Sequence, residues 1–290
     1  MTAPADPPLI DPDGLPVGQA EIEAALARIA PFYDLDMGAL ADDLPLYAAY
    51  AQVAGPAVLE VGVGTGRVAA HLAAAGCRVV GIDASPAMLA QARQRFAGGP
   101  TEGVTLVQAD IRRPPSHPAL AVGAFDLAVA PLAGLCHLLT RRDQLAAVRN
   151  VARLLRPGGW FVADLPAFDP QDWSPDLATP RLQWTRIDPR SGHTVMKLAA
   201  AQPAPAIQIQ WITYLYDETR SDGAVHRTRA RFPLRHIFRF ELEGLLEAAG
   251  LMPERCFGSY DLDDVPAFDP AERLIAVARK PSGDPGQETA

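Results

Sequence analysis

The 290-residue sequence predicts an α/β fold in which a doubly wound, mostly parallel sheet carries helices on both faces. Between residues 58 and 165, short apolar runs alternate with amphipathic helical patterns. Two closing strands, near residues 253–259 and 273–279, bring the sheet to seven strands. Residues 182–234 break this order with alternating polar and apolar residues, which predicts an inserted antiparallel sheet.

Two helices are predicted before the first strand. Apolar residues at helical spacing indicate a helix over 19–30, which Pro31 ends. Asp42 or Asp43 is expected to cap a second helix, which continues to Val53.

The alternating region follows in order. Ser85 and Pro86 form a strong helix start, because serine caps a helix and proline fits its first position. Pro157 and two glycines are expected to end another helix before the fifth strand. The predicted strands are 58–61, 78–83, 104–108, 125–130 and 160–165, and the helices are 68–75, 86–96, 141–155 and 240–250.

The same patterns divide the chain into segments. Its first residues are rich in proline, aspartate and glycine, and we expect them to form a flexible arm. The helices that follow are expected to act as a lid. The segments are the arm at 1–18, the helical lid at 19–54, the sheet domain at 55–170 and 235–281, the inserted sheet at 171–234 and a flexible tail at 282–290.

Composition argues against several classes of protein. A net charge of −8 disfavours binding to nucleic acid or to an anionic membrane. No apolar stretch has the length of a membrane span, and the N-terminus lacks a signal-peptide pattern. The scattered cysteines Cys77, Cys136 and Cys256 indicate a reducing cytoplasm without a disulfide framework. Because the histidines and cysteines lack metal-ligand spacing, no metal is expected.

A glycine-rich turn follows the first strand. Gly62, Gly64 and Gly66 alternate after Glu60, at the point where the strand passes into a helix. A helix N-terminus presents unpaired N–H groups, and glycine lets a ligand approach the backbone, so a nucleotide-like ligand is predicted. A dinucleotide fingerprint would place its third glycine where Arg67 stands. A tight turn without a ligand is the alternative.

Acidic residues end the next two strands. In a doubly wound sheet, ligands bind beyond the carboxyl ends of the strands. Asp83 lies about 20 residues past the glycines, where an acid can accept the ribose hydroxyls of a nucleoside. Its alternative role is to cap the following helix. Asp110 ends the third strand and is either a ligand contact or a plain strand-ending acid.

Taken together, these segments resemble the class I S-adenosylmethionine-dependent methyltransferases. The match also includes residues 125–127 and 155–159, in the order and spacing of that family. The resemblance implies a Rossmann-like fold with S-adenosylmethionine as cofactor and S-adenosylhomocysteine as product. In that family an acid at the position of Asp110 bonds the adenine amino group, and Ile111 would lie beside the ring. The further cofactor-binding positions that the resemblance implies are Ala84, Met88 and Leu132.

The segment after the fourth strand resembles the small-molecule branch, which includes sugar-amine N-methyltransferases and glycine N-methyltransferase-like enzymes. His137 matches a histidine of the sugar-amine enzymes, and Tyr33 matches a tyrosine from their N-terminal loop. The resemblance therefore implies these two as catalytic residues. A neutral His137 could orient the acceptor or take its proton. Packing roles are the alternative for both.

The inserted sheet is expected to give acceptor selectivity or a dimer contact. Alternation places Arg227, Arg229 and Arg231 on one face, where they could bind a carboxylate or phosphate. A solvated face is the alternative. The substrate-binding candidates are Trp184, Trp211, Tyr214 and Arg229.

The function that we predict is transfer of a methyl group from S-adenosylmethionine to N or O of a small-molecule acceptor. An NAD(P)-dependent oxidoreductase is one alternative, although the glycine spacing and the lack of a Tyr-x-x-x-Lys pair disfavour it. A catalytically silent cofactor-binding protein of the same fold is another. The predicted partners are a small molecule and a second copy of the chain, with no nucleic acid or membrane, in the cytoplasm.

Overall fold

The computed structural model describes residues 9–14, 16–97, 103–265 and 271–282. Its contacts divide the chain into two compact units. We call them the antiparallel unit, residues 1–39 with 169–236, and the parallel unit, residues 40–168 with 237–290. The predicted tail lies, from residue 283 onward, outside the described residues.

The parallel unit is built on a seven-stranded sheet with the order β12-β13-β7-β6-β3-β4-β5. Strands β7, β6, β3, β4 and β5 run parallel, while β13 is antiparallel to both of its neighbours. The predicted fold class is confirmed. The strands are β3 (Ala57–Val61), β4 (Arg78–Asp83), β5 (Val104–Gln108), β6 (Phe125–Ala130), β7 (Leu155–Pro166), β12 (Met252–Phe257) and β13 (Arg273–Arg279).

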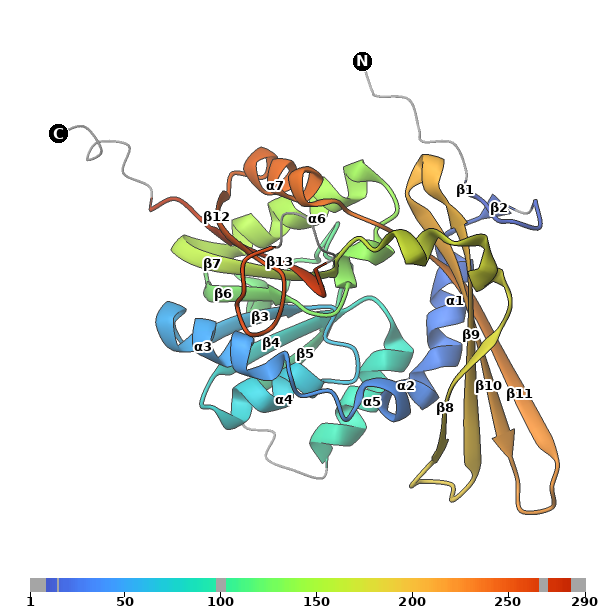
Figure 1. Ribbon diagram of the computed structural model, residues 1–290. Coiled ribbons are helices and arrows are strands. Elements are labelled where there is room, and N and C mark those ends of the chain that lie inside the picture. The colour runs from blue at the N-terminus through green and yellow to red at the C-terminus, as the bar shows by residue number, and fades with distance from the viewer. Residues whose placement is uncertain (1–8, 15, 98–102, 266–270, 283–290) are drawn as a thin grey trace. The chain divides into compact units, whose positions relative to one another are not determined.

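Helices cover both faces of this sheet (Figure 1). One face carries α3 (Leu44–Ala54), α4 (Arg67–Ala74) and α5 (Pro86–Ala97), and the other carries α6 (Arg141–Leu154) and α7 (Arg239–Ala248). Each helix turns an apolar stripe inward, as the sequence pattern predicts. In α5 the buried residues are Met88, Leu89, Ala92 and Phe96.

Strand β7 begins earlier than the sequence suggests. It starts at Leu155, directly after α6, instead of after the turn expected at Pro157 and its two glycines. Leu155 pairs with Phe125, and the register then shifts before Trp160 pairs with Leu127. A Cβ on Gly159 would lie 3.0–3.2 Å from three backbone oxygens, so the close approach of the backbone at this irregularity favours glycine.

The helical segment 19–54 divides between the two units. Helix α3 belongs to the parallel unit, where Leu46, Tyr47 and Ala51 join the core beneath the sheet. Helices α1 (Gln19–Ile29), η1 (Ala30–Phe32) and α2 (Tyr33–Met37) belong to the antiparallel unit. The segment is therefore not one continuous lid, because its two halves pack on different sheets.

The antiparallel unit contains a four-stranded sheet with the order β11-β10-β9-β8. Helix α1 packs against β11. Gly192 and Gly223, at φ +72° and +82°, lie in the turns between β8 and β9 and between β10 and β11. β10 begins at Ile209, because Gln208 turns the chain in the left-handed region just before it. The strands are β8 (Arg181–Ile187), β9 (Thr194–Ala204), β10 (Ile209–Thr219) and β11 (Val225–Arg235), and the short helices are η4 (Pro170–Trp173), η5 (Pro175–Ala178) and η6 (Pro205–Ile207).

The described part of the N-terminal segment is not a free arm. Strands β1 (Leu9–Ile10) and β2 (Pro16–Val17) pair as a small hairpin, and its aspartates form ion pairs with Arg231. Residues 1–8 and 15 lie outside the described residues. No helix within the described part of the chain is long and apolar enough to cross a membrane.

Candidate functional site

The glycine turn after β3 uses a backbone that other residues adopt at a cost. Gly62, Gly64 and Gly66 have φ values of +74°, +54° and +83°. The N–H groups of Gly62 and Val63 both donate to the carbonyl of Ile82, at 2.9 Å, which anchors the turn to the end of β4.

The three glycines differ in what surrounds them. A Cβ on Gly66 would lie 2.8 Å from the ring of Phe96, so packing within the domain excludes a side chain there. A Cβ on Gly62 would meet no atom within 4 Å. Gly62 therefore leaves open space beside the backbone at the end of β3, where a ligand can approach.

Glu60 places a carboxylate under this turn. The residue is 2% exposed, and burial raises its pKa well above the ordinary range. Its Oε2 atom is buried and has no hydrogen-bond partner among the described residues. Buried polar atoms are almost always satisfied, so this oxygen is suited to receive an N–H group from a ligand.

Arg67 explains why the turn departs from the dinucleotide pattern. Its guanidinium forms a bidentate pair with Asp43, at 2.7 and 2.6 Å, and also donates to the carbonyl of Leu40 at 2.9 Å. The pair joins the start of α4 to the start of α3. Asp43 is the N-cap residue of α3, as expected, but its carboxylate is engaged by Arg67 and makes no cap hydrogen bond.

Asp83 lies at the end of β4, next to the glycine turn. Its Oδ2 accepts the N–H of Gly64 at 2.9 Å, and its Oδ1 accepts the N–H of Ser85 at 2.8 Å. Burial raises the pKa of Asp83 despite these two bonds, which oppose the shift. Each oxygen keeps a further lone pair for a ligand hydroxyl. The neighbouring candidates are Ala84, which is exposed, and Met88, which is buried on the first turn of α5.

Asp110 follows β5 on the adjoining strand. The N–H of Ala109 donates to the carbonyl of Asp83 at 3.0 Å, so the two strand ends are joined. Arg112 holds the Asp110 carboxylate through Nε, at 2.9–3.0 Å. Burial would raise the pKa of Asp110, but the hydrogen bonds and charge of Arg112 outweigh it and lower that pKa. Ile111 beside it is buried. The Arg112 contact was not foreseen from the sequence.

The turn after β6 carries His137. Leu132 and Ala133 both adopt left-handed backbone, at φ +47° and +65°, although neither is glycine. Strain of this kind clusters at functional sites. The short helix η3 (Gly134–His137) follows, and burial lowers the pKa of the His137 imidazole to about 4. The ring is therefore neutral near neutral pH.

Asp164 near the end of β7 holds this turn in place. Its buried carboxylate accepts the N–H of Leu132 at 3.2 Å, while its backbone carbonyl accepts the N–H of Ala133 at 2.9 Å. It also accepts hydroxyls from Tyr47 and Tyr260 and two bonds from Arg273. Asp164 is not among the residues predicted from the sequence, although an acid within the apolar run 160–165 is a signal for such a role.

The four substrate-binding candidates do not share one face of the antiparallel sheet. Tyr214 pairs with Ala230 and Ala199, whereas Trp211 pairs with Pro233 and Gln202, so their side chains leave the sheet on opposite sides. The four candidates therefore divide between the two faces of the sheet. By register, Trp184 shares the face of Tyr214, and Arg229 shares the face of Trp211.

The face with Trp184 and Tyr214 carries a polar cluster among aromatic rings. Asp36 of α2 accepts the indole N–H of Trp184 at 2.8 Å and forms an ion pair with Lys197. The Lys197 ammonium lies 3.8 Å from the centre of the Tyr214 ring. Burial raises the pKa of Tyr214 to about 12. No spacing rule in the sequence connects Asp36 with Lys197.

Tyr216 and Tyr33 complete this part of the antiparallel unit. Tyr216 is fully buried and stacks on Phe32, with the ring centres 4.4 Å apart. Its hydroxyl has no hydrogen-bond partner among the described residues. Tyr33 begins α2, three residues before Asp36, whereas His137 lies in the parallel unit.

The order of the strands and the residues at their carboxyl ends together indicate the class of the parallel unit. The seven-stranded sheet with antiparallel β13 supports a positive-φ glycine turn, and an acid follows each of the next two strands. Residues 58–159 match the family model described as a methyltransferase domain. Residues 58–159 are therefore similar to a methyltransferase domain, and the parallel unit has a Rossmann-like fold.

Particular proteins share this architecture. Malonyl-acyl-carrier-protein O-methyltransferase of Enterobacter lignolyticus is 34% identical over 180 residues, which are 60% of this chain and 62% of that protein. The CcbJ methyltransferase of Streptomyces caelestis matches with a TM-score of 0.69 at 24% identity, over 89% of this chain and 98% of CcbJ.

A third comparison is with the structure of CalS10, an amino pentose methyltransferase from Micromonospora echinaspora with S-adenosylmethionine bound. It matches with a TM-score of 0.65 at 22% identity, over 86% of this chain and 95% of CalS10. The matches to curated relatives span 41 to 62% of those proteins. Within the described residues, no group of three or more His, Cys, Asp or Glu side chains is placed to hold a metal ion.

Proposed function

We propose that this chain transfers a methyl group from S-adenosylmethionine to a nitrogen or oxygen of a small-molecule acceptor. The observation that carries the proposal is the group of residues at the carboxyl ends of β3 and β4 in the parallel unit, which we call the cradle. Gly62 leaves room beside the backbone, Glu60 presents an unsatisfied buried oxygen, and Asp83 keeps lone pairs free. The space beside Gly62 matches a nucleoside, the Glu60 oxygen matches an ammonium group, and the Asp83 lone pairs match two ribose hydroxyls.

The residues present fit the cofactor. Glu60 would receive its ammonium, Asp83 its ribose hydroxyls, and Asp110 with Ile111 its adenine. The remaining contacts would come from Gly64, Gly66, Ala84, Met88 and Leu132. Bound there, S-adenosylmethionine supplies a methyl group already activated by a sulfonium, so the chain's own task is to bind and align the acceptor.

The oxidoreductase alternative has less support. Arg67 takes the place of the third dinucleotide glycine, and its bidentate pair with Asp43 makes that side chain part of the domain's structure. A cofactor-binding protein without activity would share the cradle, and only turnover separates it from the enzyme.

We further propose that His137 and Tyr33 act on the acceptor. A neutral imidazole can accept a hydrogen bond from an acceptor N–H or O–H and take its proton. The low pKa of His137, about 4, keeps it in that form. A tyrosine hydroxyl can orient the same group. Both assignments are supported by chemistry and by the resemblance to sugar-amine enzymes.

The proposed acceptor is a small polar molecule. CalS10 acts on an amino pentose, and that likeness supports a small acceptor here. The face with Trp184 and Tyr214 offers aromatic rings beside the Asp36–Lys197 ion pair. A polar molecule with hydroxyl and amino groups suits such a surface. We also propose a cytoplasmic setting, in keeping with the free thiols of Cys77, Cys136 and Cys256, and a homodimer, which sedimentation velocity would test.

Calorimetry tests the cofactor assignment. S-Adenosylmethionine and S-adenosylhomocysteine are expected to bind one per chain, and NAD is expected not to bind. Asp83→Asn should weaken both adenosyl ligands by about tenfold or more, because a charged acceptor of two hydroxyls is lost. Asp222→Asn in the β10–β11 turn is the control and should leave affinity unchanged. Unchanged affinity in Asp83→Asn, or binding of NAD, would contradict the assignment.

A further inference from the structure

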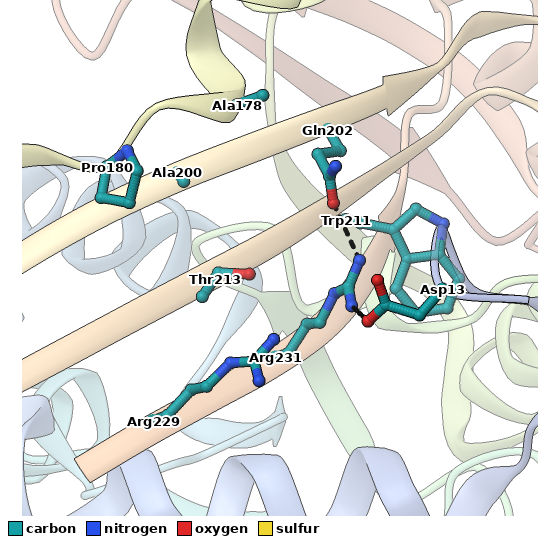
Figure 2. A pocket seen from close by; sticks show the side chains of 9 residues that line it. All are labelled: Asp13, Ala178, Pro180, Ala200, Gln202, Trp211, Thr213, Arg229 and Arg231. Atoms are coloured by element: carbon teal, nitrogen blue, oxygen red, sulfur yellow. Dashed lines mark hydrogen bonds and ion pairs between the residues drawn. The ribbon is translucent and has the colours of Figure 1, made fainter. Parts of the chain in front are cut away.

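The face of the antiparallel sheet opposite Tyr214 carries a hollow of about 200 Å³ (Figure 2). This is below the roughly 300–1,000 Å³ of pockets for drug-sized molecules, so it suits a small charged group. Strands β9, β10 and β11 form its floor, and the β1–β2 hairpin contributes Asp13. Its polar side chains are Asp13, Gln202, Thr213, Arg229 and Arg231.

Three arginines of β11 lie in a row on this face, and they differ in their partners. Arg227 forms a bidentate pair with Asp217, with both contacts at 2.6 Å. Arg231 pairs with the hairpin aspartates and donates to Gln202 at 2.8 Å. Arg229 lies between them, is exposed, and makes no hydrogen bond or ion pair with any described residue. Its guanidinium is therefore available to an external anion.

Arg231 is held in a fixed position. Its guanidinium carbon lies 5.7 Å from the centre of the buried Trp211 ring, and its side chain is 13% exposed. Its Nε is buried without a hydrogen-bond partner among the described residues. The guanidinium groups of Arg229 and Arg231 both belong to the lining of the hollow, with Thr213 beside them (Figure 2).

Asp13 occupies part of this cationic site. Its carboxylate pairs with Arg231 from the loop between β1 and β2, and its side chain is 64% exposed. Only the Asp13 end of this ion pair is exposed, since the Arg231 side chain is 13% exposed, so a stronger anion can displace the aspartate while Arg231 stays in place. The hairpin aspartate thus takes the position that an oxyanion would take.

We propose that this hollow binds the phosphate group of a small ligand and that Asp13 competes with it. The two guanidinium groups offer N–H donors to the phosphate oxygens, while Asp11 stays 3.5 Å from Arg231 and offsets part of its positive charge. The Thr213 hydroxyl and the Gln202 amide nitrogen can donate to the remaining oxygens. The site is separate from the acceptor face proposed above, because it lies on the other side of the same sheet.

Calorimetric titration with inorganic phosphate and with methyl phosphate, at fixed ionic strength, tests the site. Both are expected to bind one per chain, and a preference for methyl phosphate would identify an ester as the natural ligand. Arg229→Gln should weaken binding at least fivefold. Arg220→Gln, which removes the same charge from the exposed β10–β11 turn, should not. Asp13→Asn should strengthen binding at least threefold.

Two outcomes would overturn the proposal. Equal weakening by Arg229→Gln and Arg220→Gln would show only general attraction to a cationic surface. Unchanged or weaker binding by Asp13→Asn would show that the aspartate does not compete. Circular dichroism of each variant confirms folding, and because Arg229 and Asp13 are exposed, their substitution should leave the melting curve unchanged. The S-adenosylmethionine titration of the same samples keeps this result separate from the donor-site assignment.

Discussion

Asp164 is a carboxylate buried in the core, where it depends on several hydrogen-bond donors. Its carboxylate is fully buried and accepts hydrogen bonds from Tyr47, Tyr260, Leu132 and Arg273. A buried charge is tolerated only when it is paired and its lone pairs are satisfied. Asp164 meets both conditions, and in doing so it fixes the strained turn of Leu132 and Ala133.

Removing that charge should be costly. Asp164→Asn is expected to lower the free energy of unfolding by about 3–5 kcal/mol, because it leaves Arg273 without its buried partner. Tyr260→Phe removes one neutral donor from the same carboxylate and should cost only about 1–2 kcal/mol. Urea unfolding of both variants measures the difference. A smaller loss for Asp164→Asn than for Tyr260→Phe would contradict this account.

The pH dependence of turnover tests His137. An ordinary histidine has a pKa of about 6.5, whereas burial lowers that of His137 to about 4. The imidazole stays neutral as pH falls through 6.5 and gains its proton only near pH 4. The rate, measured by S-adenosylhomocysteine release with an acceptor found by screening amines, hydroxy acids and phenols, should therefore show no histidine inflection between pH 6 and 8.

Substitution completes this prediction. His137→Ala should lower kcat by about a hundredfold, as expected for loss of a general base, and Tyr33→Phe should lower it less. The affinity for S-adenosylmethionine should be unchanged in both variants. Unchanged kcat in both would assign the two residues to packing.

At the scale of elements, two glycine substitutions separate the effect of backbone strain from the effect on ligand binding. Gly62 and Gly76 have similar φ values, +74° and +89°, and a Cβ on either would meet nothing within 4 Å. Gly62→Ala and Gly76→Ala should therefore each cost about 1–2 kcal/mol of stability from backbone strain alone. Only Gly62→Ala should also weaken S-adenosylmethionine binding, by about tenfold or more, because its methyl group would enter the ligand's space. Equal affinity in the two variants would place the ligand elsewhere.

The elements that the sequence predicts well are those with a regular period. The strands 78–83, 104–108 and 125–130 and the buried stripe of α5 agree with the structure, because alternation and helical spacing are local signals. The early start of β7 was missed because a strand irregularity has no period. Strand ends also predicted where Asp83 and Asp110 would gather.

The contacts that the sequence cannot supply are those between distant side chains. Arg67 pairs with Asp43, and Lys197 with Asp36, across intervals that carry no spacing rule. The division of the substrate candidates between two faces has two origins. Trp211 and Tyr214 are three positions apart, which in a strand already means opposite faces. The face of Trp184, by contrast, depends on a register shift after Leu182 that no local pattern reveals.

At the scale of the whole molecule, the antiparallel sheet is inserted in the sequence of the parallel unit. The rings of Phe168 and Phe238, on either side of residues 169–236, lie 5.3 Å apart. The chain thus leaves the parallel unit and returns to it at neighbouring points. All of the proposed cofactor-binding residues belong to that unit.

This arrangement predicts an independent donor-binding domain. Residues 40–168 joined to 237–282 by a short glycine-serine linker should fold cooperatively and bind S-adenosylmethionine within about tenfold of the full chain, since inserted segments with adjacent ends are readily removed. The same protein should transfer no methyl group, because it lacks Tyr33 and the acceptor face. Thermal unfolding and calorimetry measure the first two properties. A cooperative fold without cofactor affinity would contradict the assignment of the site to this unit.

The chain has only two lysines, and both are engaged. Lys197 is 5% exposed beneath Tyr214 and paired with Asp36, and Lys280 donates to the carbonyl of Leu155 at 2.6 Å. Amine-reactive reagents should therefore modify Lys197 slowly, whereas the partly exposed Lys280 should react faster. The rate at which Lys197 is acetylated, measured by mass spectrometry, would report how often α2 separates from its sheet. An acceptor that binds here and holds α2 against its sheet would lower the acetylation rate of Lys197. The measurement would therefore also detect acceptors that bind without being methylated.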